Sequence, residues 1–340
     1  MRAALRSGLL GYTSSFVSDY APPLFDESCT KQSKDVYVKV KAAAINPVDY
    51  KLPRALGGDV FGIDFCGTIE KVGSDVDGKY KVGDEVFGTC SSGSLADYCI
   101  ANSDKIAKVP KDDSWDPSEC AALPIAYMSA LQSLRIGNIT PQDTENDDST
   151  NEQKSVLIIG ASGGCGVAGT QLCKAMGVGR IVGICSSRNS DFVKGLGATE
   201  IICYDDEKEL KAFYESNKGK FDCVYDAATN SGGGEDYWTM SIGLLKNTDI
   251  ASGKQHGEYV ALNGSAGKWI RAFTGKQKEH ETIMMMKSNS ADLDMVISLL
   301  SKIKAKPITN IIPFSEEGME NGMKQLKGRR TKGKIVFDLR

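Results

Sequence analysis

Short apolar runs alternate with helix-compatible segments through the middle of the chain. One of them, Ser-Val-Leu-Ile-Ile at residues 155–159, is typical of a strand that is buried on both faces of a parallel sheet. Similar runs follow at residues 180–185, 200–204, 221–227 and 258–262. The segments between them that suit helices are residues 166–176, 189–196 and 207–217. This alternation predicts right-handed crossovers and a doubly wound α/β sheet.

The first third of the chain has a different pattern. Val36, Val38 and Val40 face one side of a predicted strand whose other side is polar. Glycine-punctuated strands follow, among them residues 67–73 and 82–88. Regular turns at this spacing favour a small, mostly antiparallel β-barrel.

Helices and one polar stretch separate these two parts. Residues 117–122 and 126–136 suit helices. Residues 140–153 carry many acidic and polar side chains, and such a composition cannot bury a core. We therefore predict a solvated surface loop there.

The end of the chain returns to the first domain. Apolar residues fall at helical spacing from Leu293 to Ile303, behind Ser288 or Ser290 as the N-cap. A second helix is predicted from Ser315 to Gly328, before a closing strand. The predicted first domain is thus discontinuous and surrounds the second. The predicted bounds are residues 1–124 and 285–340 for the first domain and residues 125–284 for the second.

Composition excludes several classes of function. The 340 residues carry a net charge of −3, which provides no basic surface for nucleic acid. No apolar run approaches the roughly 20 residues that cross a bilayer, so we expect no integral membrane segment. The ten cysteines include no Cys-x-x-Cys pair, which favours free thiols in a reducing compartment. We expect a cytoplasmic protein, or an organellar one if a transit peptide is missing from this sequence.

The main chemical signal is a glycine turn between the first buried strand and the following helix. In Gly160-Ala161-Ser162-Gly163-Gly164-Cys165-Gly166, glycines stand where the backbone must turn tightly and approach a pyrophosphate. The N–H groups and the positive dipole at the start of the helix then bind the anion. The residues alone leave two alternatives: a tight structural turn, and a methyltransferase loop for S-adenosylmethionine.

The end of the next strand indicates which dinucleotide binds. NAD sites usually place Asp or Glu about 20 residues beyond the glycines, where it accepts a hydrogen bond from the ribose 2′-hydroxyl. Here that position falls in Ser186-Ser187-Arg188-Asn189, which contains no acid. Two hydroxyls and a guanidinium suit the 2′-phosphate of NADPH. The alternative is a surface arginine beside serines that cap a helix.

Several of these segments resemble one known family. The glycine turn, residues 186–189 and residues 44–51 (Ala-Ile-Asn-Pro-Val-Asp-Tyr-Lys) are similar to the quinone oxidoreductase branch of the medium-chain dehydrogenase/reductases. Residues 196–200 and 331–336 add to the resemblance, which covers nearly the whole chain. Within that branch, the chain is similar to chloroplast-type quinone oxidoreductase homologues and alkenal or enone reductases.

The resemblance implies a fold and a set of site residues. The fold is a GroES-like, mostly-β barrel domain interrupted by a Rossmann domain, with the active site in the cleft between them; a homodimer is also implied. Asn46 approaches the nicotinamide and the substrate, and Ser129 lies near the cofactor. The implied pyrophosphate contacts are Ala161, Ser162, Gly163, Gly164 and Cys165. The other implied cofactor contacts are Tyr204, Ala227, Ala228, Leu262, Asn263, Gly264 and Arg329.

We expect no metal site. Catalytic zinc needs cysteine, histidine and carboxylate ligands, whereas position 46 is asparagine and Asp64 stands where zinc-dependent relatives have a His-Glu pair. The two histidines, His256 and His280, are distant in sequence from the first domain. Without a Lewis acid, hydride delivery to a polarised C=C bond or to a quinone is favoured over alcohol oxidation.

The sequence therefore predicts an NADPH-dependent reductase of α,β-unsaturated carbonyl compounds or quinones. In this hypothesis Asn46, the cofactor ribose or a tyrosine holds the enolate oxygen, and solvent or Tyr50 supplies the proton. Tyr127 is the other candidate tyrosine, and packing is an alternative role for both. A second class of function stays open, namely an NADPH-binding structural or regulatory protein of the same fold with little turnover.

Overall fold

The computed structural model describes most of the chain apart from several loops. The described residues are 1–7, 13–25, 33–51, 58–76, 78–111, 114–141, 151–229, 236–246, 257–278 and 280–340. Most of the predicted polar loop at residues 140–153 lies outside these ranges, as do Cys29 and His256. The nine cysteines within the ranges are free thiols. None of the helices in these ranges combines the length and apolar character needed to span a membrane.

The chain divides into two compact units. Unit 1 comprises Met1–Met128, Lys287–Ile297 and Lys306–Arg340, and unit 2 comprises Ser129–Met286 and Ser298–Ala305. Unit 1 is therefore discontinuous in sequence. The boundaries that we predicted from the sequence, after residues 124 and 284, stay a prediction.

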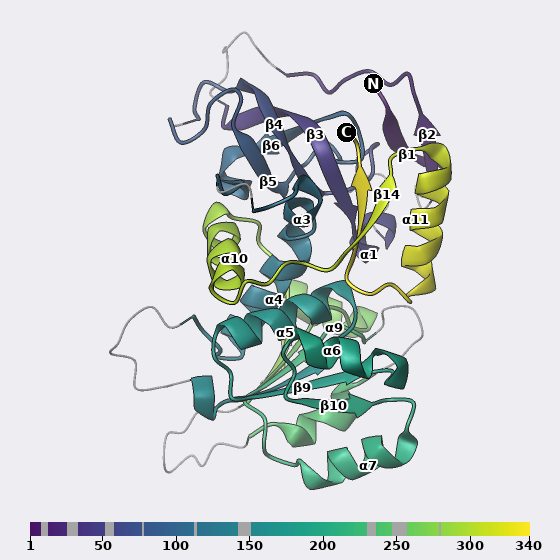
Figure 1. Ribbon diagram of the computed structural model, residues 1–340. Helices are drawn as coiled ribbons and strands as arrows, with labels where there is room; N and C mark the ends of the chain where they lie inside the picture. The colour runs from purple at the N-terminus through teal and green to yellow at the C-terminus, as the bar shows by residue number, and fades with distance from the viewer. Residues whose placement is uncertain are drawn as a thin grey trace. The chain divides into compact units, whose positions relative to one another are not determined.

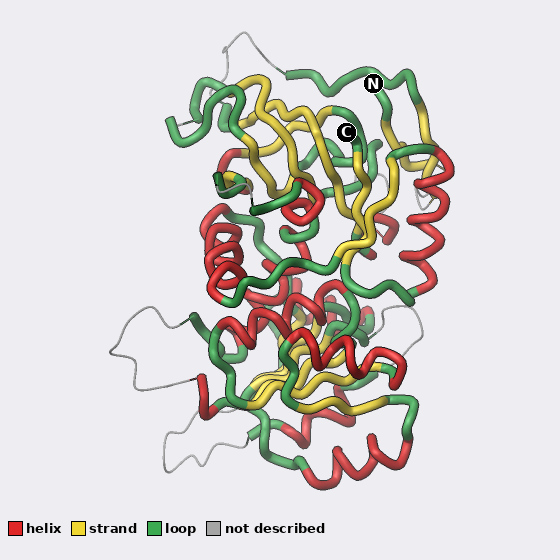
Figure 2. The backbone as a smooth tube through the Cα atoms, in the orientation of Figure 1, coloured by secondary structure: helices red, strands yellow, loops and turns green. Residues whose placement is uncertain are grey.

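Unit 2 contains a six-stranded parallel sheet (Figures 1 and 2). In spatial order the strands are β10 (Glu200–Cys203), β9 (Arg180–Cys185), β8 (Ser155–Ile159), β11 (Cys223–Asp226), β12 (Glu258–Ala261) and β13 (Glu281–Ile283). The chain starts in the middle of the sheet at β8, proceeds to β10, and then crosses back to β11. Ligands of such sheets bind at the carboxyl ends of the strands, next to the point where the order reverses.

Helices cover both faces of this sheet. Figure 1 shows α5 (Gly164–Ala175) and α6 (Ser190–Leu196) on one face and α7 (Glu207–Ser216) on the opposite face. The three helices lie where the sequence predicts them. Each connects two parallel strands, and such a connection must return the chain over a face of the sheet. Three short elements were not predicted: α8 (Trp238–Ser241), α9 (Ala266–Phe273) and β13.

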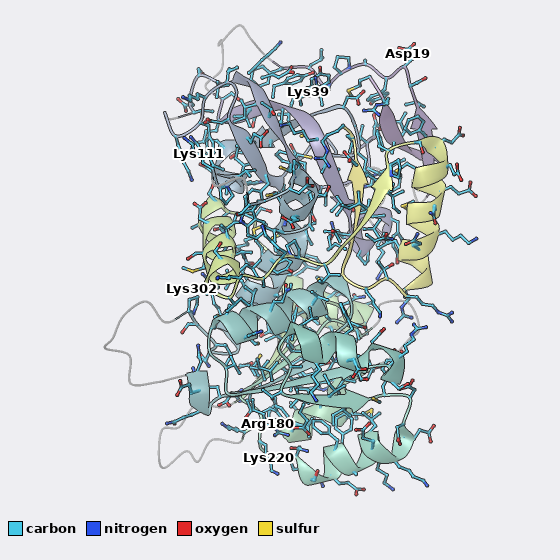
Figure 3. All side chains as sticks on the ribbon, in the orientation of Figure 1. Asp19, Lys39, Lys111, Arg180, Lys220 and Lys302 are labelled. Carbon is cyan, nitrogen blue, oxygen red and sulfur yellow. The ribbon has the colours of Figure 1, made fainter. Side chains whose placement is uncertain are left out.

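Contacts of Arg180 connect the amino ends of β9 and β10. Arg180, labelled in Figure 3, donates to Glu200 Oε2 at 2.7 Å and to Asn217 Oδ1 at 2.9 Å. Its guanidinium lies 4.9 Å from the centre of the Phe221 ring. These contacts fix the end of the sheet that lies opposite the carboxyl ends of the strands.

Unit 1 is mostly antiparallel, as predicted. Its main sheet has the order β14 (Thr309–Pro313), β15 (Lys334–Asp338), β3 (Asp35–Ile45), β4 (Asp64–Val72), β5 (Glu85–Thr89) and β7 (Ile106–Lys108), with β6 (Tyr98–Asn102) also paired to β3. The β14–β15 pair is parallel, and the other described pairs are antiparallel. A separate hairpin joins β1 (Ala3–Ser7) to β2 (Thr13–Val17).

The long strand β3 lies at the centre of the pairing in unit 1. It pairs with three strands, and its register to β4 shifts between Tyr37 and Val38 and again between Val40 and Ala42. Such bulges bend a strand and increase its twist, which allows one strand to pair with different neighbours along its length. The carboxyl end of β3 leads directly into Asn46.

The remaining helices include one cap that differs from the prediction. The helices are α1 (Pro47–Lys51), α3 (Pro117–Ala121), α4 (Pro124–Ile136), α10 (Ser290–Lys302) and α11 (Glu316–Gly328). Asn289, rather than Ser288 or Ser290, accepts a hydrogen bond from the Asp292 N–H at 2.8 Å and donates to Asp292 Oδ2 at 2.8 Å. An asparagine amide can make both bonds, whereas Ser290 Oγ donates to Ile106 O at 2.6 Å. The predicted helix at Ser315 to Gly328 is α11, and Ser315 caps it, because Ser315 Oγ accepts from Gly318 N.

Candidate functional site

The glycine turn joins the carboxyl end of β8 to the start of α5. Gly160 has a φ of 79°, a conformation that favours glycine. The N–H groups of Gly160 and Ala161 donate to Ile184 O at 3.1 and 3.0 Å, which fixes the turn to β9. The N-cap of α5 is Gly163, and no side chain caps the helix. The first turn of a helix presents N–H groups that its own carbonyls do not accept, and these suit a pyrophosphate.

The glycines of the turn have different roles. A Cβ atom on Gly166 would lie 2.6 Å from Ala161 Cα and closer still to Gly160 O. At Gly163 the nearest atom to an added Cβ would be Gly160 O, at 3.5 Å. Gly166 therefore lets the helix pack against the turn, whereas Gly163 keeps the space before the helix open. The cradle fits a dinucleotide pyrophosphate.

The loop after β9 adjoins the glycine turn. Asn189 Nδ2 donates to Ser162 Oγ at 3.1 Å, which connects two of the predicted cofactor-binding segments. Within the described part of the chain, buried Ser186 Oγ and Asn189 Oδ1 have no hydrogen-bond partner. The Ser186 hydroxyl can donate to a phosphate or a hydroxyl group, whereas Asn189 Oδ1 can only accept, for example from a hydroxyl group. Arg188 belongs to the short 3-10 turn η3 (Ser187–Asn189) in the same loop.

Sequence reasoning missed one residue at this loop, Asp205. Its Oδ1 accepts the Ser187 N–H at 2.8 Å, and its Oδ2 accepts the Ser187 hydroxyl at 2.8 Å. These two bonds, and then the charge of Arg188, hold the pKa of Asp205 below its ordinary value. No local sequence signal marks this contact, because only the observed register of β9 and β10, with Cys203 opposite Cys185, brings Asp205 to Ser187.

Tyr204 precedes that acid and lies at the surface. Its side chain is 47% exposed, and its N–H donates to Cys185 O at 3.0 Å. The backbone bond holds the end of β10 against the end of β9. Its role as an adenosine contact stays a prediction.

The loops after β11 and β12 reach the same edge of the sheet. Asp226 Oδ1 accepts the N–H groups of Ala228 at 2.8 Å and Thr229 at 2.9 Å, and the Tyr259 hydroxyl donates to Asp226 Oδ2. Burial, and then the negative charge of Asp226, raise the pKa of Tyr259 and keep its hydroxyl a donor. Sequence reasoning missed Asp226 as the residue that shapes the predicted contact at Ala228.

The remaining predicted contacts of this edge are held by backbone bonds. Ala227 N donates to Ile159 O at 3.1 Å, and Leu262 N donates to Asp226 O at 3.0 Å. Asn263 Oδ1 accepts from Gly264 N at 2.9 Å and from Trp269 Nε1 at 3.0 Å. Parallel register thus collects the predicted residues after β8, β9, β11 and β12 at one edge.

In unit 1, a buried polar cluster surrounds Asn46. Asn46 Nδ2 donates to Asp64 Oδ2 at 2.9 Å, and its Oδ1 accepts from the Lys334 ammonium group. Lys334 Nζ lies 3.3 Å from Asp64 Oδ2 and donates to Ile45 O at 3.2 Å. The Asp64 and Lys334 side chains are 0% and 6% exposed. The Asn46 amide is therefore held in one orientation, with one N–H and one lone pair left for a ligand.

Lys334 was absent from the predicted site. Its ammonium lies among three oxygen atoms, those of Ile45, Asn46 and Asp64. Asn46 and Asp64 are the residues that stand in place of the zinc ligands expected of zinc-dependent relatives. Burial raises the pKa of Asp64, and the positive charge of Lys334 lowers it. Among the residues that the structure describes, no group of three or more His, Cys, Asp or Glu side chains could hold a metal ion.

Asp49 adds a second buried carboxylate to this cluster. Its Oδ2 accepts the Asn46 N–H at 2.7 Å, and Arg6 donates to its backbone carbonyl. Its Oδ1 has no hydrogen-bond partner among the described residues. Burial raises the pKa of Asp49 to about 7, and the charge of Asp64 acts in the same direction. The Asn46 hydrogen bond and the charges of Lys334 and Arg6 oppose this increase.

The predicted tyrosines differ in their surroundings. Tyr50 is partly buried, with Lys327 Nζ 5.9 Å from its ring centre. Burial raises the pKa of Tyr50, and the charge of nearby Arg329 lowers it, so the structure brings these two predicted residues together. Tyr127 lies in α4 and is 1% exposed. Ser129, the first residue of unit 2, is also buried.

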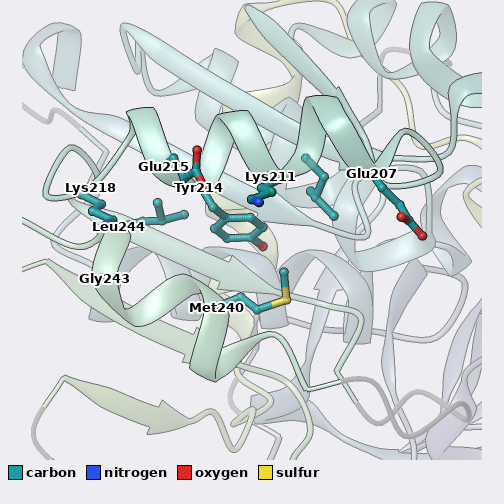
Figure 4. A pocket seen from close by; sticks show the side chains of 9 residues that line it. Glu207, Lys211, Tyr214, Glu215, Lys218, Met240, Gly243 and Leu244 are labelled. Atoms are coloured by element: carbon teal, nitrogen blue, oxygen red, sulfur yellow. The ribbon is translucent and has the colours of Figure 1, made fainter.

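A separate cavity of about 390 Å³ lies in unit 2 between α7, α8 and the turn Ile242–Leu244 (Figure 4). Its apolar lining is Leu210, Tyr214, Met240 and Leu244. Lys211 and Glu215 also line it. None of the predicted site residues lines it, so the cavity is distinct from the edge that collects the predicted cofactor contacts.

Comparisons with known proteins identify the family of the chain. Residues 32–111 match the family model described as alcohol dehydrogenase GroES-like domain. The chain is 33% identical over 322 residues to the chloroplastic quinone-oxidoreductase homolog of Spinacia oleracea, with 90% of each chain covered. It is 30% identical over 322 residues to the 2-methylene-furan-3-one reductase of Solanum lycopersicum, covering 89% of this chain and 71% of the relative.

A solved structure supports the same fold. The quinone oxidoreductase from Coxiella burnetii matches with a TM-score of 0.74 and 26% identity, covering 100% of this chain and 99% of that one. The predicted fold class is confirmed: a GroES-like domain and a Rossmann parallel-sheet domain. The individual site residues stay predictions.

We expect Lys334→Met to destabilise the protein by about 3–5 kcal/mol, because it leaves Asp64 buried without its cation. The double variant Asp64→Asn/Lys334→Met should recover most of this loss, since both charges are removed. Urea denaturation of the single and double variants measures the free energies of unfolding. Lys332→Met, at an exposed position, is the matched control. Additive effects of the two substitutions would contradict the inferred pairing.

Asp49 should make stability depend on pH. Its pKa is raised from 3.8 to about 7 in the fold, so between these values the folded state binds more protons than the unfolded state. The free energy of unfolding then falls as pH rises through this window, by at most about 1.4 kcal/mol per pH unit from this group. Asp49→Asn should reduce the slope, measured by urea denaturation at several pH values. Exposed Asp75→Asn should leave it unchanged; equal slopes in all three proteins would refute the inference.

Proposed function

Because this chain belongs to the quinone oxidoreductase branch of the medium-chain dehydrogenase/reductase superfamily and is an oxidoreductase, we propose that it reduces α,β-unsaturated carbonyl compounds or quinones with NADPH. The observation that carries the proposal is the glycine cradle at the carboxyl edge of the parallel sheet. One relative is named for reducing a 2-methylene-furan-3-one, whose C=C bond is conjugated to a ketone.

The residues after β9 support NADPH as the proposed coenzyme. Arg188 provides a guanidinium, and buried Ser186 Oγ has no hydrogen-bond partner among the described residues. Ser187 is a further proposed contact, although its hydroxyl donates to Asp205 Oδ2 in this structure. A guanidinium can bind a 2′-phosphate through two parallel hydrogen bonds, which a ribose hydroxyl cannot offer. The other proposed contacts follow β8, β10, β11 and β12, with Ser129 and Arg329 as additional ones.

The chemistry assigned to NADPH is hydride donation from its nicotinamide ring to the β-carbon of the substrate. We assign Asn46 to the carbonyl oxygen, since its second amide N–H is not used by Asp64. Lys334 and Asp64 orient that amide. Tyr50, or solvent, donates the proton to the resulting enolate; burial raises the pKa of Tyr50, which keeps its hydroxyl protonated at neutral pH. We propose no metal, because the Lys334 ammonium already lies among the oxygens of Ile45, Asn46 and Asp64.

We propose that the protein is cytoplasmic and forms a homodimer. Small carbonyl compounds or quinones are its partners in this proposal, and neither nucleic acid nor membrane is required for the reaction. Free thiols, such as buried Cys66 and Cys173, are compatible with a reducing compartment.

Transfer of labelled hydride tests the reaction. With NADPH that carries deuterium at C4, we expect the label on the β-carbon of a small enone, because conjugate addition leaves the negative charge on the carbonyl oxygen. Mass spectrometry and NMR of the product locate the deuterium. Label on the carbonyl carbon would reject conjugate reduction. Coenzyme binding without turnover across a panel of enones and quinones would favour the structural or regulatory alternative.

Arg188→Ala tests the coenzyme. Loss of a charged hydrogen bond to the 2′-phosphate should lower kcat/KM for NADPH by about tenfold or more and change that for NADH by less than about twofold. Lys194→Ala serves as the control, because it removes the positive charge of an exposed side chain on α6 in the same unit. Equal losses with both coenzymes would contradict the assignment of Arg188 to the phosphate.

A further inference from the structure

Asp205 follows the neighbouring strand, and its carboxylate contacts the loop where the sequence rule for coenzyme choice expects an acid. The rule considers the end of β9, which carries Ser186, Ser187 and Arg188. In the parallel pair β9–β10, Cys203 lies opposite Cys185, so the residues that follow the two strands continue side by side. The carboxylate of Asp205 therefore meets the Ser187 donors.

The contacts of Asp205 occupy the donors that a phosphate would use. Its Oδ1 is 2.8 Å from Ser187 N, and its Oδ2 is 2.8 Å from Ser187 Oγ. The side chain is exposed at the edge of the sheet, and Arg188 interacts with it electrostatically. An incoming 2′-phosphate would meet a negative charge that already holds the hydroxyl and N–H group of Ser187.

Neighbouring acids face other groups. Asp206 Oδ1 accepts the N–H groups of Lys208 at 3.1 Å and Glu209 at 3.0 Å, and so caps α7. Glu209 Oε2 accepts from Cys203 N at 3.0 Å. Of these three acids, Asp205 is the one whose carboxylate binds the loop after β9.

We propose that Asp205 determines coenzyme specificity by limiting the preference for NADPH over NADH. Its carboxylate competes with the 2′-phosphate for the Ser187 N–H and hydroxyl and repels that phosphate. Each carboxylate oxygen retains a lone pair beyond its bond to Ser187, so the same group can accept a hydrogen bond from the 2′-hydroxyl of NADH. Asp205 thus takes the part of the acid that is absent from the end of β9. The inference rests on the proposed function, because it assumes that a nicotinamide dinucleotide binds at this edge.

Fluorescence titration with NADPH and with NADH, in the full chain and without substrate, tests this inference. Asp205→Asn keeps an oxygen acceptor for Ser187 and removes the charge. We expect NADPH to bind about fivefold more tightly to this variant at low salt, with a smaller gain at high salt because ions screen exposed charges. NADH should bind equally or more weakly. Asp205→Ser, which also lacks the charge, should shift the ratio of the two affinities in the same direction.

Glu215→Gln is the matched control, since it removes one negative charge from the far end of α7. It should leave the ratio of affinities unchanged. An unchanged ratio in both Asp205 variants, or weaker binding of NADPH, would overturn the inference while leaving the proposed function intact. A wild-type chain that binds neither coenzyme would instead overturn the proposed function and this inference with it.

Discussion

The close approach of α5 to the end of β8 is the constraint on which the proposed nucleotide site depends. Because Gly166 has no side chain, the helix can begin against the backbone of Gly160 and Ala161. The N–H groups of those two residues are bound to Ile184 O, so β8, β9 and α5 meet in one fixed turn. Strand register then brings the loops after the other strands to the same edge, where contacts such as Asn189 Nδ2 to Ser162 Oγ hold them.

Unit 1 meets a different constraint, the cost of burying charge. An ammonium without partners would be costly to bury, and Lys334 is surrounded by the oxygens of Ile45, Asn46 and Asp64. The Asp49 carboxylate has fewer partners, since its Oδ1 has no hydrogen-bond partner among the described residues. Hydrophobic residues could fill the same space at no electrostatic cost. The gain from the charged cluster is geometrical: it holds the Asn46 amide in one orientation.

The sequence predicts the parts of this fold that depend on local pattern. Strands β8 to β12 have apolar runs, and the glycine turn has a recognisable spacing, so both were found at the right positions. Lys334 could not be found this way, because it lies 288 residues from Asn46 and only the pairing of β15 with β3 brings it there. The cap of α10 was misassigned for a local reason, because serine and asparagine are both good caps and only the contacts of Ser290 distinguish them.

Coenzyme selection shows why a local rule is insufficient even where the motif is clear. The residues after β9 include a guanidinium and two hydroxyls, which by themselves suit a phosphate. Parallel register adds the end of β10, and with it a carboxylate that binds the same Ser187. Since Arg188 and Asp205 have opposite charges, their fields largely cancel beyond a short distance in water. In the proposed coenzyme site, discrimination then depends on which group touches the ribose 2′-substituent, and that is a property of two adjacent strand ends together.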